Sequence, residues 1–416
     1  MALLASLLSW ADNVEVDGIY YELDYPAKTA SVTYNMVVAG NYETYSGDVV
    51  IPEKITYNGD EFVVTEIGPQ AFLTSKTMTS VVIPETVTKI QANAFGFCTG
   101  LTSIDIPNSV KEFGGFVFSS CTKLKTVHLG NGIKVLSGRI FQGCTKLESI
   151  NLPEGLTTIG DYAFEVCRSL KTIDIPSTVS HIDAGVFRAC DALETMRVSS
   201  DNPWFDSREG CNAIIETGTN KLVAGCHTTV IPKTVTSIGE MAFKEVRGLA
   251  SLTIPGNVKS IGFSAFEKAG ILDLTLEEGV KTIDSYAFYN NDAMTSVSLP
   301  STLTSIGEYG FNDCMHLNEV KAYMPEPFQL NGAVFGRNAG TCVLYVPQGT
   351  RDAYIENGWN ENQFMGGVVE MDDETGIGAA GTDSHLSTVR KVLNRNRITI
   401  ITPDNRKFSI DGSRIK

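Results

Sequence analysis

The sequence predicts a mainly β solenoid, a chain wound into repeated coils whose strands stack in parallel. A fixed period of 20–29 residues is typical of such folds, because one unit buries its apolar face only against its neighbours. The hydrophobic content of 43% over 416 residues provides enough apolar side chains for one continuous core. The period is marked by a recurring phenylalanine, at Phe72, Phe95, Phe118, Phe141, Phe164, Phe187, Phe243, Phe266, Phe288, Phe311 and Phe335. Most of these are 22–24 residues apart, with a single gap of 56.

Residues 101–123 show how one coil is built. The segment 101–106 has the alternating apolar residues of a short strand, and Pro107 ends it. A second short strand is expected at 110–113, followed by a short helical or 3₁₀ stretch that places Phe118 in the core. Each coil then advances the stack by one strand spacing, about 4.8 Å.

Units of the form L-x-S-I-x-I-P-x-x-V-x-x-I-G-x-x-A-F-x-x-C resemble the BspA-like leucine-rich repeat of bacterial surface proteins, over roughly residues 60–350. The resemblance implies a right-handed leucine-rich-repeat stack, and the phenylalanine period gives this stack about eleven 23-residue coils with parallel strands and short helical or 3₁₀ turns. The solenoid is expected over residues 67–345. The resemblance also implies an exported protein and, where a role is known in the family, adhesion to host proteins or other cells.

The two ends of the solenoid are expected to carry β-rich caps, since a bare end coil exposes strand edges and core. Residues 13–66 fit an N-terminal cap, with the hairpin-turn signals Asp17-Gly18 and Asn58-Gly59. Residues 346–371 fit the C-terminal cap, and the resemblance implies that Tyr354 and Trp359 close the last coil.

The 56-residue gap indicates an insertion over residues 199–231, which reads as a hairpin that projects from one rim or folds over it. Insertions in repeat proteins often bind partners, although structural decoration is the alternative. Trp204 and Phe205 precede the hairpin and are the best aromatic candidates for a contact site. Cys211 and Cys226 lie near its open end, so a disulfide between them is geometrically possible.

Five further binding candidates lie at one outward position of successive strands, next to the strand's proline. These are Asp105, His128, Asn151, Asp174 and Arg197. Asp105 and Asp174 are three coils apart, about 14 Å by strand spacing, which is too far for a paired-carboxylate mechanism. No nucleophile completes a triad with His128. The sequence therefore predicts a binding protein with no enzymatic activity, no cofactor and no metal site.

Six cysteines occupy the position three residues after the core phenylalanine. Val246 and Ala269 occupy the same position in other coils, which indicates a small, mostly apolar slot and buried free thiols. Disulfides and metal binding are the alternatives, but a one-dimensional row of thiols suits metal coordination poorly. The six cysteines are Cys98, Cys121, Cys144, Cys167, Cys190 and Cys314.

The net charge of −15 argues against a nucleic-acid partner. Residues 1–12 look like the remnant of a secretory signal peptide, with a mis-assigned start or an ordinary buried strand as alternatives. The chain has no apolar stretch long enough to span a bilayer. Residues 372–385 fit a linker, and residues 386–416, which are basic, fit a short β tail. This tail is a sorting or anchoring tag, a folded cap or a flexible remnant.

These observations favour a secreted or cell-surface bacterial protein that binds an extracellular protein or glycan, with adhesion as its role, and that acts as a monomer. An envelope scaffold without a specific ligand is the alternative. An enzyme that acts on polysaccharide is a more remote one.

Overall fold

The structure is a computed structural model of the chain. It describes residues 13–35, 45–338 and 340–371, together with the backbone of four strands between residues 390 and 415. The chain divides into two compact units, Met1–Glu370 and Met371–Lys416. The expected signal remnant (1–12) and linker (372–385) lie outside the described residues.

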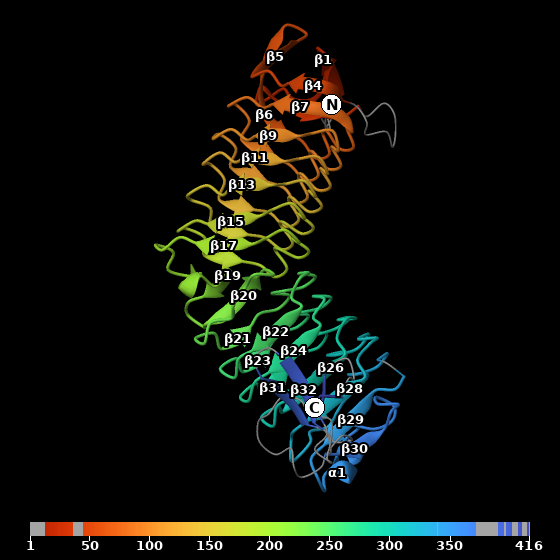
Figure 1. The fold of residues 1–416 in the computed structure, drawn as a ribbon. Helices are drawn as coiled ribbons and strands as arrows, with labels where there is room; N and C mark the ends of the chain where they lie inside the picture. Colours follow the sequence, from red (N-terminus) through yellow and green to blue (C-terminus); the bar gives the residue numbers. More distant parts are fainter. Residues whose placement is uncertain are drawn as a thin grey trace, which may run out of the picture. The chain divides into compact units, whose positions relative to one another are not determined.

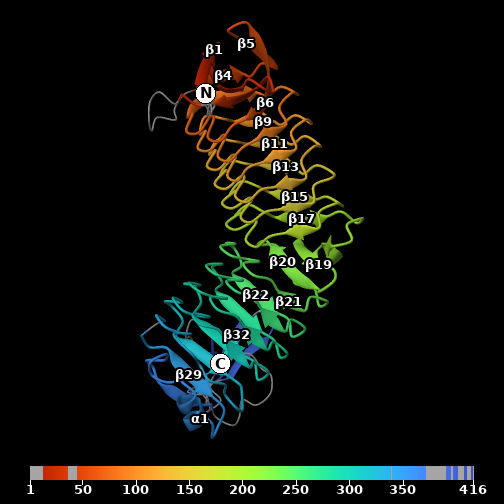
Figure 2. The ribbon, with the colours of Figure 1, turned by 180° about the vertical axis from the view of Figure 1, so that it is seen from behind.

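The first unit is a parallel β-solenoid, and Figures 1 and 2 show its coils stacked from the N-terminal cap onward. Consecutive strands pair in register one coil apart, for example Thr126 with Ser103 and with Ser149. The first strands of the coils are β4 (Ser46–Val50), β7 (Thr77–Val82), β9 (Ser103–Asp105), β11 (Thr126–His128), β13 (Ser149–Asn151), β15 (Thr172–Ile175), β17 (Thr195–Val198), β22 (Ser251–Ile254), β24 (Asp273–Leu276), β26 (Ser296–Leu299), β28 (Glu319–Ala322), β29 (Val343–Val346) and β30 (Val368–Glu370).

This row gives about 13 turns rather than the eleven expected from the phenylalanine period. The difference arises because the row continues through β29 and β30, beyond the last core phenylalanine, Phe335. These end strands lie outside the run of phenylalanine-marked units, so the period alone does not count them.

A second row of two-residue strands lies across the coil from the first. Ile159 pairs with Leu136 and Ile182 of the neighbouring coils, and all three alternate with exposed or half-exposed residues. The row consists of β8 (Lys89–Ile90), β10 (Glu112–Phe113), β12 (Val135–Leu136), β14 (Thr158–Ile159), β16 (His181–Ile182), β21 (Ser237–Ile238), β23 (Ser260–Ile261), β25 (Thr282–Ile283) and β27 (Ser305–Ile306).

The N-terminal end is an antiparallel meander joined to this second row. β1 (Asn13–Val16), β2 (Ile19–Asp24) and β3 (Thr29–Thr33) pair in order. β3 then pairs in parallel with β6 (Asp60–Ile67), which also pairs with β5 (Lys54–Tyr57) and with β8. The meander therefore covers the first coil with strands, as a cap must.

The segment around each core phenylalanine is a run of turns, where the sequence suggested a short helix. The N–H groups of Gln70, Phe72 and Thr74 donate to carbonyl groups of the next coil at 2.7–3.0 Å, whereas those of the residues between them donate within their own coil. This alternation needs a left-handed residue two positions before and two after the phenylalanine. Non-glycine residues occupy most of these positions, with φ between 51° and 62°.

The core is a stack of phenylalanine rings. Neighbouring rings lie nearly parallel with centroids 4.8–5.6 Å apart, from Phe72 to Phe187 and again from Phe243 to Phe335. Among the described residues, no ring contact joins Phe187 to Phe243. The buried side chains accordingly form two hydrophobic clusters, with the insertion between them.

The position three residues after the core phenylalanine is buried, and its side chain donates a hydrogen bond to a backbone carbonyl group. Each of the six thiols donates to the carbonyl oxygen of the core phenylalanine in the preceding coil, at 2.9–3.5 Å. Asn291 occupies the same slot, and its Nδ2 donates to Phe266 in the same way at 2.8 Å. All nine cysteines are free and buried.

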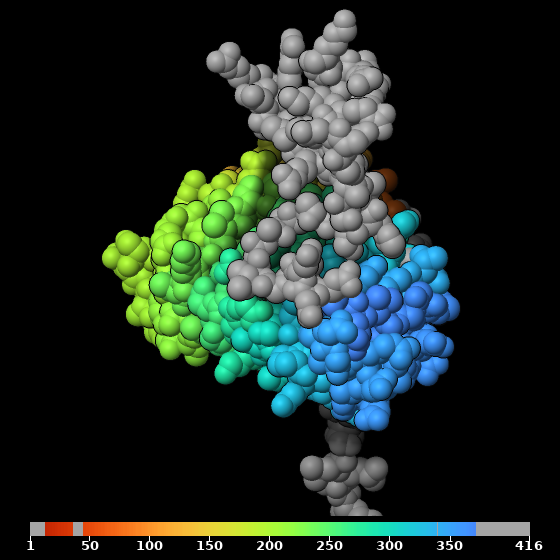
Figure 3. Space-filling model, turned by 60° about the horizontal axis from the view of Figure 1, so that its bottom comes forward, coloured from red at the N-terminus to blue at the C-terminus, as the bar shows by residue number. Residues whose placement is uncertain are grey.

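The last coil contains the helix α1 (Arg351–Glu356), which lies between β29 and β30 in the sequence. Tyr354 and Trp359 are fully buried here. The Tyr354 hydroxyl donates to Met324 and the Trp359 indole donates to Phe328, both at 2.8 Å. Figure 3 shows these last coils in blue at one end of the unit.

The second unit is a four-stranded antiparallel sheet. It consists of β31 (Arg390–Asn394), β32 (Arg397–Ile401), β33 (Lys407–Ser409) and β34 (Arg414–Ile415). Over the residues that the structure describes, no helix has the length and apolar character needed to cross a membrane.

Candidate functional site

The insertion is a hairpin that forms a layer of the stack. Its elements are β18 (Phe205–Asp206), the 3₁₀ turn η1 (Arg208–Gly210), β19 (Ala213–Glu216) and β20 (Lys221–Gly225). β20 pairs in parallel with β21, so the hairpin continues the second row of strands. Ile214 belongs to the hydrophobic cluster on the N-terminal side, and Ala213 and Ile215 belong to the other. The hairpin is therefore covered on both faces, which excludes the first of the two arrangements expected from the sequence, a hairpin that projects from one rim.

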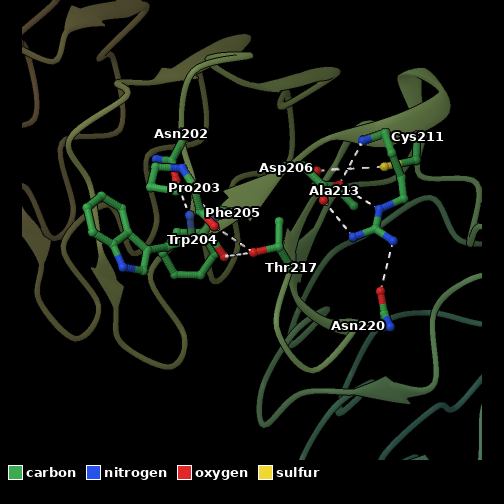
Figure 4. A network of polar contacts seen from close by, with 10 residues as sticks. Asn202, Pro203, Trp204, Phe205, Asp206, Cys211, Ala213, Thr217 and Asn220 are labelled. Atoms are coloured by element: carbon green, nitrogen blue, oxygen red, sulfur yellow. Dashed lines mark hydrogen bonds and ion pairs between the residues drawn. The ribbon is translucent and has the colours of Figure 1, made fainter.

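The Asn202 side chain fixes the backbone where the chain enters the hairpin (Figure 4). Its Nδ2 donates to the carbonyl oxygens of Pro176 and Val179 at 2.8 and 2.9 Å. Its Oδ1 accepts from the backbone N–H groups of Trp204 and Phe205, both at 2.9 Å. One buried amide therefore satisfies four backbone groups and fixes the chain just before the aromatic pair.

The two aromatic candidates lie in different environments. The Trp204 side chain is 47% exposed, and its indole takes part in none of the contacts drawn in Figure 4. Phe205 is only 4% exposed and packs in the N-terminal cluster. The expectation that Phe205 contacts a ligand is therefore wrong for this structure, because its ring fills the core. Trp204 remains available.

A charged cluster stiffens the other side of the hairpin. Arg208 contacts both carboxylate oxygens of Asp206, at 2.8 and 2.5 Å, and its Nη1 donates to Asn220 at 2.8 Å. This bidentate contact raises the pKa of Arg208, so the guanidinium stays charged. The contact also links η1 to the hairpin loop (Figure 4).

Cys211 and Cys226 are free thiols, so the disulfide considered from the sequence is absent from this structure. The Cys211 thiol donates to the carbonyl oxygen of Ala213 at 3.7 Å, and the Cys226 thiol donates to that of Asn212 at 3.4 Å. The two residues also belong to different hydrophobic clusters. Each sulfur therefore has its own backbone partner within the hairpin.

The five outward candidates stand in register on the first row of strands. His128 pairs with Asp105 on one side and Asn151 on the other, and Asp174 pairs with Arg197. The imidazole Nδ1 of His128 lies 2.6 Å from an Asp105 oxygen, although the two side chains are 71% and 86% exposed. Such open pairs contribute little to stability.

Asp174 and Arg197 have a different setting, at the edge of a hollow of about 290 Å³. Arg197 contacts Asp174 at 3.2 Å. Four of the residues that line the hollow are apolar, and the hydroxyl of Ser177 donates to Glu154 at 3.1 Å. The hollow is lined by Leu152, Glu154, Asp174, Ile175, Pro176, Arg197, Val198 and Ser199.

The hollow and the hairpin entry are joined through Pro176, which lines the hollow and accepts the Asn202 hydrogen bond. A mainly apolar lining with a few charged groups is the usual composition of a binding site. The lining of this hollow includes two carboxylates and one guanidinium, so it offers both hydrogen-bond donors and acceptors. We call the hollow together with Trp204 the Asp174 site.

Sequence reasoning did not find Glu154 and Ser199, because they follow the strand rather than lie on its outward row. Extending the row past the proline of each coil would have found Glu154. The described residues include no group of three or more His, Cys, Asp or Glu side chains placed to hold a metal ion. The charged groups of the Asp174 site are open to solvent, whereas electrostatic catalysis depends on a water-excluded site.

The sequence matches the BspA type leucine rich repeat region in six copies, over residues 65–194 and 223–336. No curated protein matches the chain by sequence. Among solved structures, the chain is similar to a leucine rich cell surface protein from Faecalibacterium prausnitzii A2-165, with a TM-score of 0.60 and 22% identity. That alignment covers 88% of this chain and 96% of the other.

The pneumococcal vaccine antigen PcpA has a similar fold, also with a TM-score of 0.60, at 19% identity. The alignment covers 87% of this chain and 99% of that protein. At these identities the two likenesses concern the fold.

Proposed function

Because the chain belongs to the BspA type leucine rich repeat family, we propose that it is an exported cell-surface protein that binds an extracellular protein or glycan. We assign the contact to the Asp174 site and the adjoining outward face of the first strands. Adhesion to a host or to another cell is the role that this assignment serves. Catalysis is not part of the proposal, and the protein acts as a monomer.

The observation that supports the proposal is the position of the Asp174 site. It lies where the regular repeat stops and the hairpin begins, so it differs from every other stretch of the stack. Asp174 and Arg197 stand on strands with fixed register, and Trp204 follows a buried asparagine that fixes the backbone. A preorganised surface loses less entropy on binding.

The descriptions of two similar structures support the proposed localisation at the cell surface. One of them is described as a cell surface protein and another as a vaccine antigen. Both descriptions suit a protein displayed outside the cell. For this chain, surface display is tested directly by protease shaving of intact cells that produce it.

Binding is tested by capture on immobilised extracellular matrix proteins and on a glycan array. Trp204→Ala and Arg197→Ala should each reduce retention strongly, because exposed Trp and Arg side chains dominate many interfaces. Thr253→Ala is the matched control, since Thr253 holds the same outward position on β22 in the second half of the stack. Its retention should equal that of the wild type.

Equal retention of the wild type and both Asp174-site variants would remove this site as the contact surface. Negligible retention on every surface would instead favour an envelope scaffold without a specific ligand.

A further inference from the structure

A second surface lies on the turn side of the coils and is built from aromatic side chains. The residue two positions before the core phenylalanine has left-handed backbone, and in several coils it is an aromatic residue only partly buried. Phe116, Tyr162, Tyr286 and Tyr309 occupy this position. The same position is repeated in every coil, so neighbouring members of the row lie one strand spacing apart.

In the first half of the stack, one of these positions holds a cation. Arg139 lies between Phe116 and Tyr162, with its guanidinium carbon 5.5 Å and 4.8 Å from the two ring centroids. Asp161 contacts the same guanidinium at 3.3 Å. Two aromatic rings and a carboxylate thus form a complete site for a guanidinium, filled by the chain's own arginine.

The second half has aromatic rings and carboxylates in the same row of turns, but here the rings of neighbouring coils contact one another directly. The Tyr286 ring lies 5.7 Å from Phe263, 5.4 Å from Tyr289 and 4.9 Å from Tyr309, measured between centroids. In the part of the chain that the structure describes, no Lys or Arg lies over any of these four rings. We call these residues, with the carboxylates of Asp284 and Glu308, the Tyr286 cluster.

The carboxylates supply the negative charge at this cluster. Glu308 adjoins Tyr309, and its charge raises the pKa of the Tyr309 hydroxyl. Asp284 precedes Tyr286 by two residues, and its Oδ1 accepts a hydrogen bond from the neighbouring Ser285 N–H at 2.7 Å. Over the described residues, neither carboxylate forms an ion pair. By contrast, Glu245 and Glu267 nearby are both paired with basic side chains.

We propose that the Tyr286 cluster binds an arginine side chain from an extended, basic segment of a partner protein. Arg139 shows how this chain's own turn row accommodates a guanidinium between rings and carboxylate. Charge complementarity points the same way, since the whole chain has a net charge of −15. The surface is separate from the Asp174 site, so this inference stands independently of the proposed function.

The experiment measures the fluorescence anisotropy of a labelled oligo-arginine peptide titrated with the full chain, beside a citrulline peptide of equal length. Citrulline has nearly the shape of arginine without its charge. Tyr286→Ser introduces the residue that the neighbouring coil has at this position, Ser264, so the fold should tolerate it. We expect this variant and Tyr309→Ser to weaken binding several-fold each, and the citrulline peptide to bind at least about tenfold more weakly than the arginine peptide.

Two controls separate a specific site from general attraction to an acidic protein. Asp201→Asn removes one exposed carboxylate elsewhere and should leave the affinity within twofold, whereas Asp284→Asn should weaken it several-fold. Arg139→Ser empties the equivalent site in the first half and should add one further site for the arginine peptide.

Unchanged affinity in both tyrosine variants would overturn the proposal, and so would equal binding of the citrulline peptide. Loss of glycan-array binding in the tyrosine variants, without any effect on the peptide, would assign the cluster to a glycan and overturn it as well.

Discussion

Phe164→Ala tests the central element of the fold, the stacked phenylalanine core. Phe164 is fully buried, and its ring lies 5.6 Å from Phe141 on one side and 5.6 Å from Phe187 on the other. Truncation removes the apolar area of one side chain, leaves a cavity and ends both ring contacts. Because the rings are locked between coils by backbone hydrogen bonds, neighbouring residues have little room to fill that cavity.

The expected cost in the free energy of unfolding is about 3–5 kcal/mol. Burial of a phenylalanine side chain contributes roughly 1.5–3 kcal/mol of this, and each lost ring pair adds about 0.5–1.5 kcal/mol. Urea denaturation followed by circular dichroism, with several probes to detect partial unfolding of the stack, measures the change.

Phe97→Ala is the matched control, since Phe97 lies in a turn of the same stack, two residues after the core Phe95, and is 49% exposed. It should change the unfolding free energy by less than about 1 kcal/mol. A loss of less than about 1 kcal/mol for Phe164→Ala itself would refute the burial and stacking argument.

Three further predictions concern an ion pair between coils, the buried thiols and a glycine with left-handed backbone. Burial alone would raise the pKa of Glu245, but the hydrogen bond and positive charge of Arg188, 2.8 Å away, outweigh it and hold the pKa below its ordinary value. The stabilisation from this pair is therefore present above the unfolded-state pKa of about 4.5 and is lost as the pH falls through the folded-state pKa, so thermal melts of wild type and Glu245→Gln should differ near pH 7 and converge in acid. A difference independent of pH would contradict this. Burial raises the pKa of Cys314 and of Cys342 to about 12, so a thiol reagent should modify the cysteines only after unfolding, and rapid labelling of several thiols in the native protein would exclude the buried slot. Gly143 has a φ of 74°, so Gly143→Ala should cost about 1–2 kcal/mol. Gly115→Ala, at a glycine with ordinary φ and free space for a methyl group, should cost less; equal costs would argue against the strain.

Much of the stack was predictable from the sequence because a constant period fixes the register. The row through Asp105, His128, Asn151, Asp174 and Arg197 was assigned by counting, and the structure pairs the members on neighbouring strands as expected. One residue of slippage would have placed every side chain on the wrong face. Counting by the repeat period assigns residues wrongly only where the period is interrupted, at the insertion and at the two ends of the solenoid.

The turn segments were harder to predict because their conformation depends on the neighbouring coil. An Ala-Phe pair favours a helix locally, yet the N–H groups of alternate residues reach the next coil, and the first and last of these donors have left-handed backbone. Residues as unsuited to positive φ as Val166 and Phe116 adopt it here, with φ of 62° and 60°. No local propensity reveals such a position when the stabilising hydrogen bonds come from residues 22 positions away.

The hairpin had a signal that the sequence interpretation did not use. Ala213, Ile214 and Ile215 form a continuous apolar run, which is typical of a strand covered on both faces, whereas a projecting hairpin would alternate. All three residues are buried. The hollow had no comparable signal, because it depends on how far apart three consecutive coils place the turns that follow their first strands.

The burial of the hairpin explains why a binding surface at the insertion keeps a fixed shape. The phenylalanine stack ends at Phe187 and restarts at Phe243, so the cores on either side would each expose apolar surface without a layer between them. β19 supplies that layer, with Ile214 directed to one core and Ile215 to the other. Any movement of the hairpin would expose both cores at once, which is more costly than the motion of an ordinary surface loop. Trp204 is held to this layer through its backbone hydrogen bond to Asn202, so the interruption that breaks the repeat also fixes the backbone of an exposed tryptophan.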